Sequence, residues 1–178
     1  MHLSNATCDV PLNTLTQLTA LEIDRCTFPS LTALPRSLCR LSVDQCTGFP
    51  LPFLSALTGL TWCSMRGVFE PQNVEGTVVP TVDIASLTRL VFLSTDIPHP
   101  LILPSSLRTI AIKPHSDIDF SRIPEVHCLM LTDCQQFTFR LPPVVHQLSV
   151  SRMNNNFVRF RDTRVDVLVL AESSFNLM

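Results

Sequence analysis

The stretch LTALEIDRC at residues 18–26 recurs, with conservative changes, as LCRLSVDQC at residues 38–46. Three apolar residues and a cysteine occupy the same positions in both copies, which begin 20 residues apart. We write the shared template as apolar-x-x-apolar-x-apolar-x-x-anchor, in which the anchor is the last residue. A pattern repeated at a period of about 20 residues predicts a solenoid, in which each copy is one structural unit.

The template continues along most of the chain. Six further copies are LTGLTWCSM (57–65), LTRLVFLST (87–95), LRTIAIKPH (107–115), VHCLMLTDC (126–134), VHQLSVSRM (145–153) and VDVLVLAES (165–173). Successive copies begin 20, 19, 30, 20, 19, 19 and 20 residues apart. An ordinary α/β domain would not keep this spacing. We therefore predict a single domain over 1–178, with about eight repeats that begin near residues 18, 38, 57, 87, 107, 126, 145 and 165.

Each copy has the pattern of a short strand. Leu41 and Val43 are two residues apart and face the same side of a strand, and Leu38 precedes them and can turn into the same core. One unit cannot close a core, whereas stacked units bury each other's apolar rows and pair their strands in a parallel sheet. Prolines precede several strands, at positions 35, 104, 124, 142 and 143. Because proline fixes its own backbone and lacks an N–H, the return segments should be extended or polyproline-like, with little helix.

These residues give the chain a resemblance to the leucine-rich repeat family, whose consensus L-x-x-L-x-L-x-x-(N/C) fits all eight copies when apolar exchanges are allowed. The phrases LPRSLCRLSV (34–43) and LPSSLRTIAI (103–112) and the 19–20-residue period are most similar to the short, effector-type bacterial class. The resemblance covers residues 18–173. It implies an α/β-class superhelix, here mainly β, with a parallel sheet on the concave face and extended convex segments. It further implies that the concave face, and in some members the loops, bind other proteins.

The anchor position departs from the family, which prefers asparagine there. The chain instead has Cys26, Cys46, Met65, Thr95, His115, Cys134, Met153 and Ser173. Cysteine is small, easily buried and a weak hydrogen-bond donor, whereas methionine cannot donate at all. We therefore expect an incomplete ladder of anchor hydrogen bonds.

Composition narrows the class of protein. Of the 178 residues, 46% are apolar and 16% are charged, so a packed core is expected. The net charge of −2 gives no general reason to expect nucleic acid or an anionic membrane as the partner. Apolar runs are short, and the first ten residues lack the pattern of a secretory signal. Seven cysteines cannot all pair in a monomer, so we expect reduced thiols and a cytoplasmic or nuclear location.

Chemical motifs are sparse. The sequence has no Gly-x-Ser-x-Gly, H-E-x-x-H, P-loop or dinucleotide fingerprint, so we predict no enzyme, no cofactor and no small-molecule substrate. His127, Cys128 and Cys134 come nearest to a metal cluster, but the first two point to opposite sides of a strand, and we predict no metal site. Basic residues also gather at Arg152, Arg159, Arg161 and Arg164. They could bind RNA, but Asp162 and Asp166 dilute their charge and favour a solvated outer face.

Residues that alternate with the core positions should face outward and are the candidate binding residues. They are Glu22, Asp24, Arg40, Asp44, Arg89, Val91, Leu93, Ala111, Lys113 and Met130. Val91, Leu93 and Met130 would be apolar anchors, and the charged residues would set the electrostatic register. The apolar patch could equally be covered by the chain's own loops. We predict a non-catalytic protein-recognition module; the alternative is a structural or substrate-recognition segment of a larger protein, such as a ubiquitin-ligase-type assembly.

Two segments stand outside the regular pattern. The 30-residue spacing leaves an insertion at 66–83, for which we favour a protruding loop over a decayed repeat. The last strand, Val165–Ala171, carries Val167 and Val169 at outward positions, where a terminal repeat normally has a polar surface. We expect this strand to be covered by the tail Ser174–Met178, another domain or a second copy, and it offers a site of association.

Overall fold

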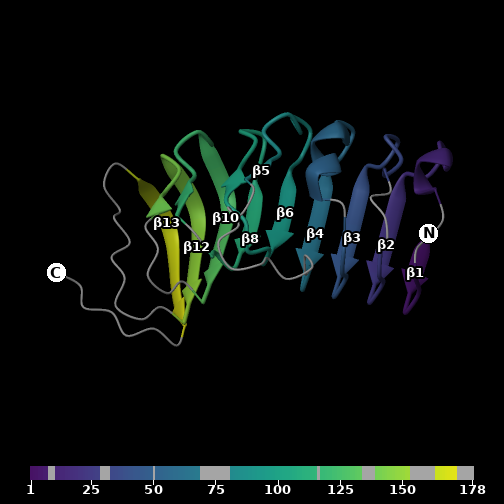
Figure 1. The fold of residues 1–178 in the computed structure, drawn as a ribbon. Helices are drawn as coiled ribbons and strands as arrows, with labels where there is room; N and C mark the ends of the chain where they lie inside the picture. The colour runs from purple at the N-terminus through teal and green to yellow at the C-terminus, as the bar shows by residue number, and fades with distance from the viewer. Residues whose placement is uncertain are drawn as a thin grey trace.

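The computed structural model describes residues 1–7, 11–28, 33–49, 51–68, 81–115, 117–133, 139–152 and 163–171. The chain is a parallel β-solenoid, in which nine strands lie side by side in chain order (Figure 1). The strands are β1 (His2–Ser4), β2 (Ala20–Asp24), β3 (Arg40–Asp44), β4 (Trp62–Arg66), β6 (Phe92–Thr95), β8 (Thr109–Ile112), β10 (Glu125–Thr132), β12 (Val144–Ser151) and β13 (Arg164–Ala171). All their pairings are parallel, which confirms the predicted sheet.

The return segments contain little regular structure. Two short parallel pairs lie there: β5 (Val82–Asp83) with β7 (Leu101–Ile102), and β9 (Ile118–Asp119) with β11 (Phe139–Arg140). The helical segments are the 3-10 turns η1 (Leu12–Thr14) and η2 (Leu51–Ala56), and the described residues contain no α-helix. The prediction of little helix is thus confirmed for this part of the chain. None of the described helical segments has the length and hydrophobicity needed to span a bilayer.

The core is made of apolar rows that run across the sheet from repeat to repeat. One row aligns Leu21, Leu41, Cys63, Leu93, Ile110, Leu129 and Leu148, all at most 2% exposed. Each side chain in this row packs against its counterpart one repeat away. Stacking of this kind explains why the apolar period is conserved along the chain, because a polar residue in a row would be buried between two apolar neighbours.

Serine hydroxyls connect the return segments of neighbouring repeats. Ser37 Oγ in LPRSL donates to the carbonyl oxygen of Leu18 at 2.8 Å, and Ser106 Oγ in LPSSL donates to that of Leu90 at 2.7 Å. Each serine stands directly before the first buried leucine of its repeat. The L-P-x-S-L motif therefore places a hydroxyl donor next to a backbone carbonyl of the preceding repeat that would otherwise lack a hydrogen bond.

The strand register corrects the repeat frame in the third and fourth copies. Trp62 pairs with Arg40, and Cys63 pairs with Leu41, so the third repeat begins at Leu60 rather than at Leu57. Likewise Leu93 pairs with Cys63 and with Ile110, so the fourth repeat begins at Leu90 rather than at Leu87. All four leucines are buried, so apolar pattern alone fits both frames.

The turn after each strand shows why the corrected frame is the one adopted. Asn5, Arg25, Gln45, Asp133 and Arg152 all follow their strands with φ between 49° and 53°. Gly67, with φ of 55°, holds the equivalent place only if the third repeat begins at Leu60. A glycine accepts this left-handed backbone without strain, whereas the frame from Leu57 has Ser64 there.

The corrected frame also changes the predicted anchors. Cys26 and Cys46 are buried at anchor positions, as predicted. Met65 and Thr95 are not anchors, because they pair with Val43 and Ile112 inside the strands. His115 is exposed and is not a buried anchor. The other predicted anchors, Cys134, Met153 and Ser173, lie outside the described residues.

The predicted loop at 66–83 is partly built into the solenoid. Arg66 ends β4, Val68 is 3% exposed, and Val82–Asp83 forms β5. Both ends of the insertion therefore belong to the packed fold rather than to a loop. Its middle, 69–80, lies outside the described residues, so the protruding loop stays a prediction for that part.

Candidate functional site

The nine-stranded sheet has one face on the core and one face of outward side chains, which we call the open face. At its centre lies a cation–aromatic stack. The Arg40 guanidinium carbon lies 4.4 Å from the centroid of the Trp62 ring, and the Trp62 and Phe92 ring centroids are 5.0 Å apart with planes inclined by 7°. The guanidinium is thus placed for a cation–π interaction, and the two rings form a parallel stacked pair.

Strand register produces this stack. Arg40 on β3, Trp62 on β4 and Phe92 on β6 are direct partners in consecutive strand pairs. Adjacent parallel strands are about 4.8 Å apart, close to the separation of stacked rings. Three large planar groups at one register position therefore line up along the sheet without further adjustment. Arg40 is exposed and the two rings are half-buried, so the stack is accessible from solvent.

Small side chains flank the stack. The next outward row holds Ser42, Ser64 and Ser94 on the same three strands. Ser64 and Ser94 are only 9% and 5% exposed, so this row presents little polar surface beside the stack. Val91, which precedes β6, is 46% exposed and extends the apolar surface beside Phe92.

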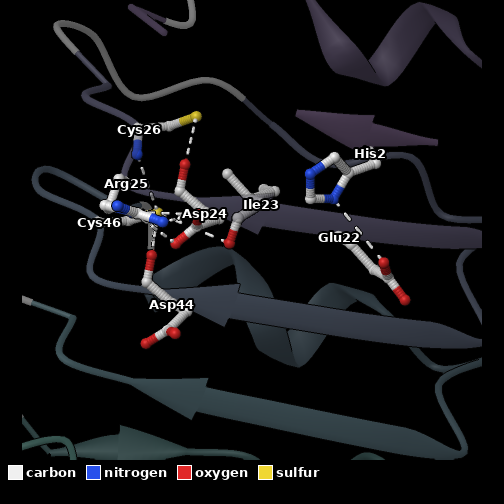
Figure 2. A network of polar contacts seen from close by, with 8 residues as sticks. All are labelled: His2, Glu22, Ile23, Asp24, Arg25, Cys26, Asp44 and Cys46. Carbon is white, nitrogen blue, oxygen red and sulfur yellow. Dashed lines mark hydrogen bonds and ion pairs between the residues drawn. The ribbon is translucent and has the colours of Figure 1, made fainter. Parts of the chain in front are cut away.

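An acidic group lies on the β2 and β3 side of the stack. Glu22, Asp24 and Asp44 all point outward from these strands. His2 Nδ1 lies 3.7 Å from Glu22 Oε2, and Arg25 Nη2 lies 3.0 Å from Asp24 Oδ2 (Figure 2). The hydrogen bond from Arg25 to Asp24 raises the pKa of the Arg25 guanidinium. Two carboxylates of the group therefore have basic neighbours on the protein itself.

Cysteine thiols bond to the carbonyls at the ends of β2 and β3, in the turns that follow these carboxylates (Figure 2). Cys26 Sγ donates to the Asp24 carbonyl at 3.4 Å, and Cys46 Sγ donates to the Asp44 carbonyl at 3.2 Å. The Cys26 backbone N–H donates to Cys46 Sγ at 3.5 Å, so one anchor bonds to the next. Cys26 and Cys46 therefore form hydrogen bonds within and between successive turns, as expected for residues at the anchor position. Burial raises the pKa of the Cys46 thiol, which keeps it protonated and able to donate.

Burial makes two further thiols, those of Cys63 and Cys128, less reactive. Burial raises the pKa of Cys63 to about 12 and also raises that of Cys128. A thiol with a raised pKa carries little thiolate near neutral pH and is a poor nucleophile. Cys26, Cys39, Cys46, Cys63 and Cys128 are all free in the described part of the chain.

A second charged group lies farther along the sheet. Lys113 Nζ, just after β8, is 3.0 Å from Asp133 Oδ2, and Arg152 Nη1 is 3.4 Å from Asp133 Oδ1. The hydrogen bond from Lys113 is the main cause of the lowered pKa of Asp133. Ala111 and Met130, direct partners on β8 and β10, are half-buried on the open face nearby.

The structure places most of the predicted binding residues on the open face, but not all of them. Seven have outward positions on the sheet or directly after a strand: Glu22, Asp24, Arg40, Asp44, Ala111, Lys113 and Met130. Val91 is exposed at the start of the fourth repeat, and Arg89 is exposed in the turn before it rather than on a strand. Leu93 was wrongly assigned to the open face. It is fully buried, because the frame of its repeat is shifted by three residues.

The same shift hid Trp62 and Phe92, because both fall on an apolar position of the template in the frames that begin at Leu57 and Leu87. Gly67 could have revealed Trp62, because it aligns with Arg25 and Gln45 at the left-handed turn position only in the corrected frame of the third repeat. No comparable sequence feature predicts which charged residues of neighbouring repeats form ion pairs.

A possible metal-binding group lies apart from the stack. Glu125, His127 and His146 each offer one ligand atom, and these atoms lie within 4.8 Å of one another. They occupy the beginning of β10 and β12.

The fold and its open face define a parallel β-solenoid with an accessible surface of aromatic, cationic and acidic side chains. Comparisons of the chain with protein-family models, with curated proteins and with solved structures give no match in any of the three.

Proposed function

We propose that this chain is a leucine-rich-repeat-type solenoid that recognises a protein partner through its open face, without catalysis. The repeated L-x-x-L-x-L pattern and the cysteine anchors support the leucine-rich-repeat assignment. The single observation that carries the binding proposal is the Arg40–Trp62–Phe92 stack on an accessible sheet face. Tryptophan and arginine are enriched among the residues that dominate binding energy at protein interfaces.

The chemistry of the face favours a partner segment with an apolar or aromatic side chain next to a basic one. The apolar group would pack on Trp62, Phe92 and Val91. The basic group would lie toward Glu22, Asp24 and Asp44, where three carboxylates gather on adjacent strands. Because regular strands hold these side chains in place, binding would require little ordering of the solenoid.

The proposal is tested by paired affinity capture from native cell extract. The baits are the wild-type chain, the double variant Trp62→Ser/Phe92→Ser, and the control variant Phe53→Ser. Phe53 is an aromatic residue in η2, outside the sheet, and is 36% exposed. Circular dichroism and thermal melting establish that each bait is folded.

Partners bound by the open face are retained by the wild type and Phe53→Ser and lost from the double variant. Equal capture by all three baits contradicts the proposal. Capture lost after ribonuclease treatment would instead support an RNA-binding role. Arg164, one of the arginines considered for that role, has its Nε 2.9 Å from Asp166 Oδ1.

A second candidate function is that of a structural or substrate-recognition segment within a larger assembly. The last strand supports it, because Val167, Leu168, Val169 and Leu170 of β13 are 40–52% exposed. Four consecutive apolar residues on an edge strand provide a surface for association. The tail Ser174–Met178, which was expected to cover this strand, lies outside the described residues.

A further inference from the structure

Four polar side chains line up across the last three strands of the sheet, at the ends where those strands begin. Glu125 and His127 belong to β10, His146 to β12 and Asp166 to β13. His146 Nε2 lies 2.7 Å from Glu125 Oε1, and His146 Nδ1 lies 2.6 Å from Asp166 Oδ2. The His127 and His146 ring centroids are 5.4 Å apart. Both ring nitrogens of His146 therefore contact a carboxylate, and the His127 ring lies beside them.

We infer that Glu125, His127 and His146 form a zinc-binding site, and that Asp166 orients the His146 ring. Two imidazoles and one carboxylate are a ligand set that zinc accepts, with a water molecule in the remaining position. The ligand atoms lie within 4.8 Å of one another, so small rotations of the side chains bring them around one ion. A carboxylate is one of the common partners of the far nitrogen of a ligating histidine at zinc sites.

The repeat architecture explains why these residues meet. His127, His146 and Asp166 each follow the first apolar residue of their repeat, which is Val126, Val145 or Val165. Equivalent positions in successive repeats become neighbours across the sheet. Glu125 stands two residues before His127 and therefore points to the same side of the strand.

The surroundings allow an ion to enter. The side chains of Glu125, His146 and Asp166 are 45%, 40% and 32% exposed. Two guanidinium groups lie close by. Arg164 Nε donates to Asp166 Oδ1 at 2.9 Å, whereas Oδ2 of Asp166 faces His146. The guanidinium of Arg108 donates from Nη1 to the backbone carbonyls of Leu107 at 3.0 Å and Glu125 at 3.3 Å. It is thus turned toward main-chain oxygens rather than bonded to the Glu125 carboxylate.

The competing explanation is a metal-free ion pair, with a protonated His146 between Glu125 and Asp166. The two explanations differ in the role of His127. The ion pair does not require it, because Glu125 and Asp166 already occupy both ring nitrogens of His146. A zinc site needs it as a ligand.

The experiment is a calorimetric titration of the full chain with zinc chloride near neutral pH. The variants are His127→Gln, His146→Gln and Asp166→Asn, with His2→Gln as the matched control. His2 also lies beside a carboxylate, 3.7 Å from Glu22, but has no second histidine among the described residues near it. Circular dichroism establishes folding. Cobalt(II) spectra report the ligand type, because thiolate ligands give sulfur-to-metal charge-transfer bands and histidine and carboxylate do not.

We expect one zinc ion per wild-type chain. Affinity should fall at least about 100-fold in His127→Gln and His146→Gln, and about 10- to 100-fold in Asp166→Asn, the range typical of outer-shell partners. His2→Gln should bind like the wild type. Three results would overturn the site: no saturable binding to the wild type, wild-type affinity in His127→Gln, or thiolate bands in the cobalt spectrum. The outcome is independent of partner capture on the open face.

Discussion

Trp62 and Phe92 stack on adjacent strands with ring centroids 5.0 Å apart, although 30 residues separate them in the chain. The contact exists because the intervening residues form one complete repeat with an insertion, and the next strand returns to the same register. Arg40 continues the stack on the other side of Trp62. A row of planar groups on a solvent-accessible sheet face is the main feature that distinguishes the middle of this solenoid from its ends.

The stack can be tested by fluorescence, because Trp62 is the single tryptophan of the chain. Phe92→Ala should shift its emission to longer wavelength and increase quenching by acrylamide, since one face of the indole gains solvent. The free energy of unfolding should fall, with about 0.5–1.5 kcal/mol of the loss due to the aromatic pair itself. Phe53→Ala is the control and should leave the emission unchanged. Unchanged quenching in Phe92→Ala would show that the rings do not stack in solution.

The turn glycines should differ sharply in their tolerance of a side chain. Gly48 has φ of +68°, and a Cβ there would lie 2.4 Å from the Phe28 carbonyl oxygen. Gly48→Ala should therefore cost at least about 2 kcal/mol, from left-handed backbone strain and this collision. Gly67 has φ of +55°, and its Cβ would meet the flexible Gln45 Cγ at 3.3 Å. Gly67→Asn should cost less than about 1 kcal/mol in urea denaturation, because asparagine tolerates this backbone. Equal losses in the two variants would contradict the turn geometry.

Thiol reactivity should follow burial. Cys63 is 2% exposed and burial raises its pKa to about 12, so it should resist alkylation at pH 8 until the protein unfolds. Among the described cysteines, Cys39 and Cys128 are half-buried and should react before Cys63. Mass spectrometry of alkylated peptides over time measures the order. Rapid native labelling of Cys63 would show that the third repeat follows the frame with Trp62 in the core.

The same thiol contributes to the pH dependence of stability. Its folded pKa is raised above the unfolded value of about 8.5, so the folded state holds the proton more tightly. The contribution is complete below about pH 8.5 and is lost as pH rises toward 12. Cys63→Ala should therefore flatten the alkaline decline in the free energy of unfolding. An identical alkaline decline in both proteins would contradict the burial of this group.

A carboxylate should support the turn after β9. Asp119 Oδ1 accepts a hydrogen bond from the Ser121 backbone N–H at 2.9 Å, and the bonds from Ser121 lower the pKa of Asp119. Asp119→Ala should cost about 0.5–1.5 kcal/mol, whereas Asp119→Asn keeps an acceptor and should cost less. Because the folded pKa is depressed, the ionic part of this contribution is present above about pH 4 and is lost at lower pH. Equal losses in the two variants at neutral pH would exclude the hydrogen bond as the cause.

The last strand should govern self-association. Val167→Lys/Val169→Lys places two charges on outward positions of β13, which are 52% and 40% exposed, without changing Leu168 or Leu170. Light scattering across a concentration series should show less association than in the wild type, since a charged edge resists strand pairing. Ser149→Lys, on the neighbouring strand, is the control. Association that persists unchanged would place the contact elsewhere.

The order and direction of the strands followed from the sequence alone. Buried rows such as Leu21, Leu41 and Leu129 need an apolar residue at the same point of every repeat, so the fold leaves a periodic signal in the chain. The same periodicity predicted outward positions for Glu22 and Arg40 on the first two full repeats, where only one frame fits the pattern.

Where two repeat frames fit the apolar pattern, the tertiary structure decided between them. Leu57 and Leu60 are both buried, so hydrophobicity could not choose between them, and the register against Leu41 placed Cys63 in the core and Trp62 on the surface. It also assembled Glu125, His127 and His146 from two repeats. The apolar period arises because each core position must exclude water, so the type of residue at each position already indicates burial. Stacks and ligand clusters depend on which side chains become neighbours, which is settled only when the strands pair.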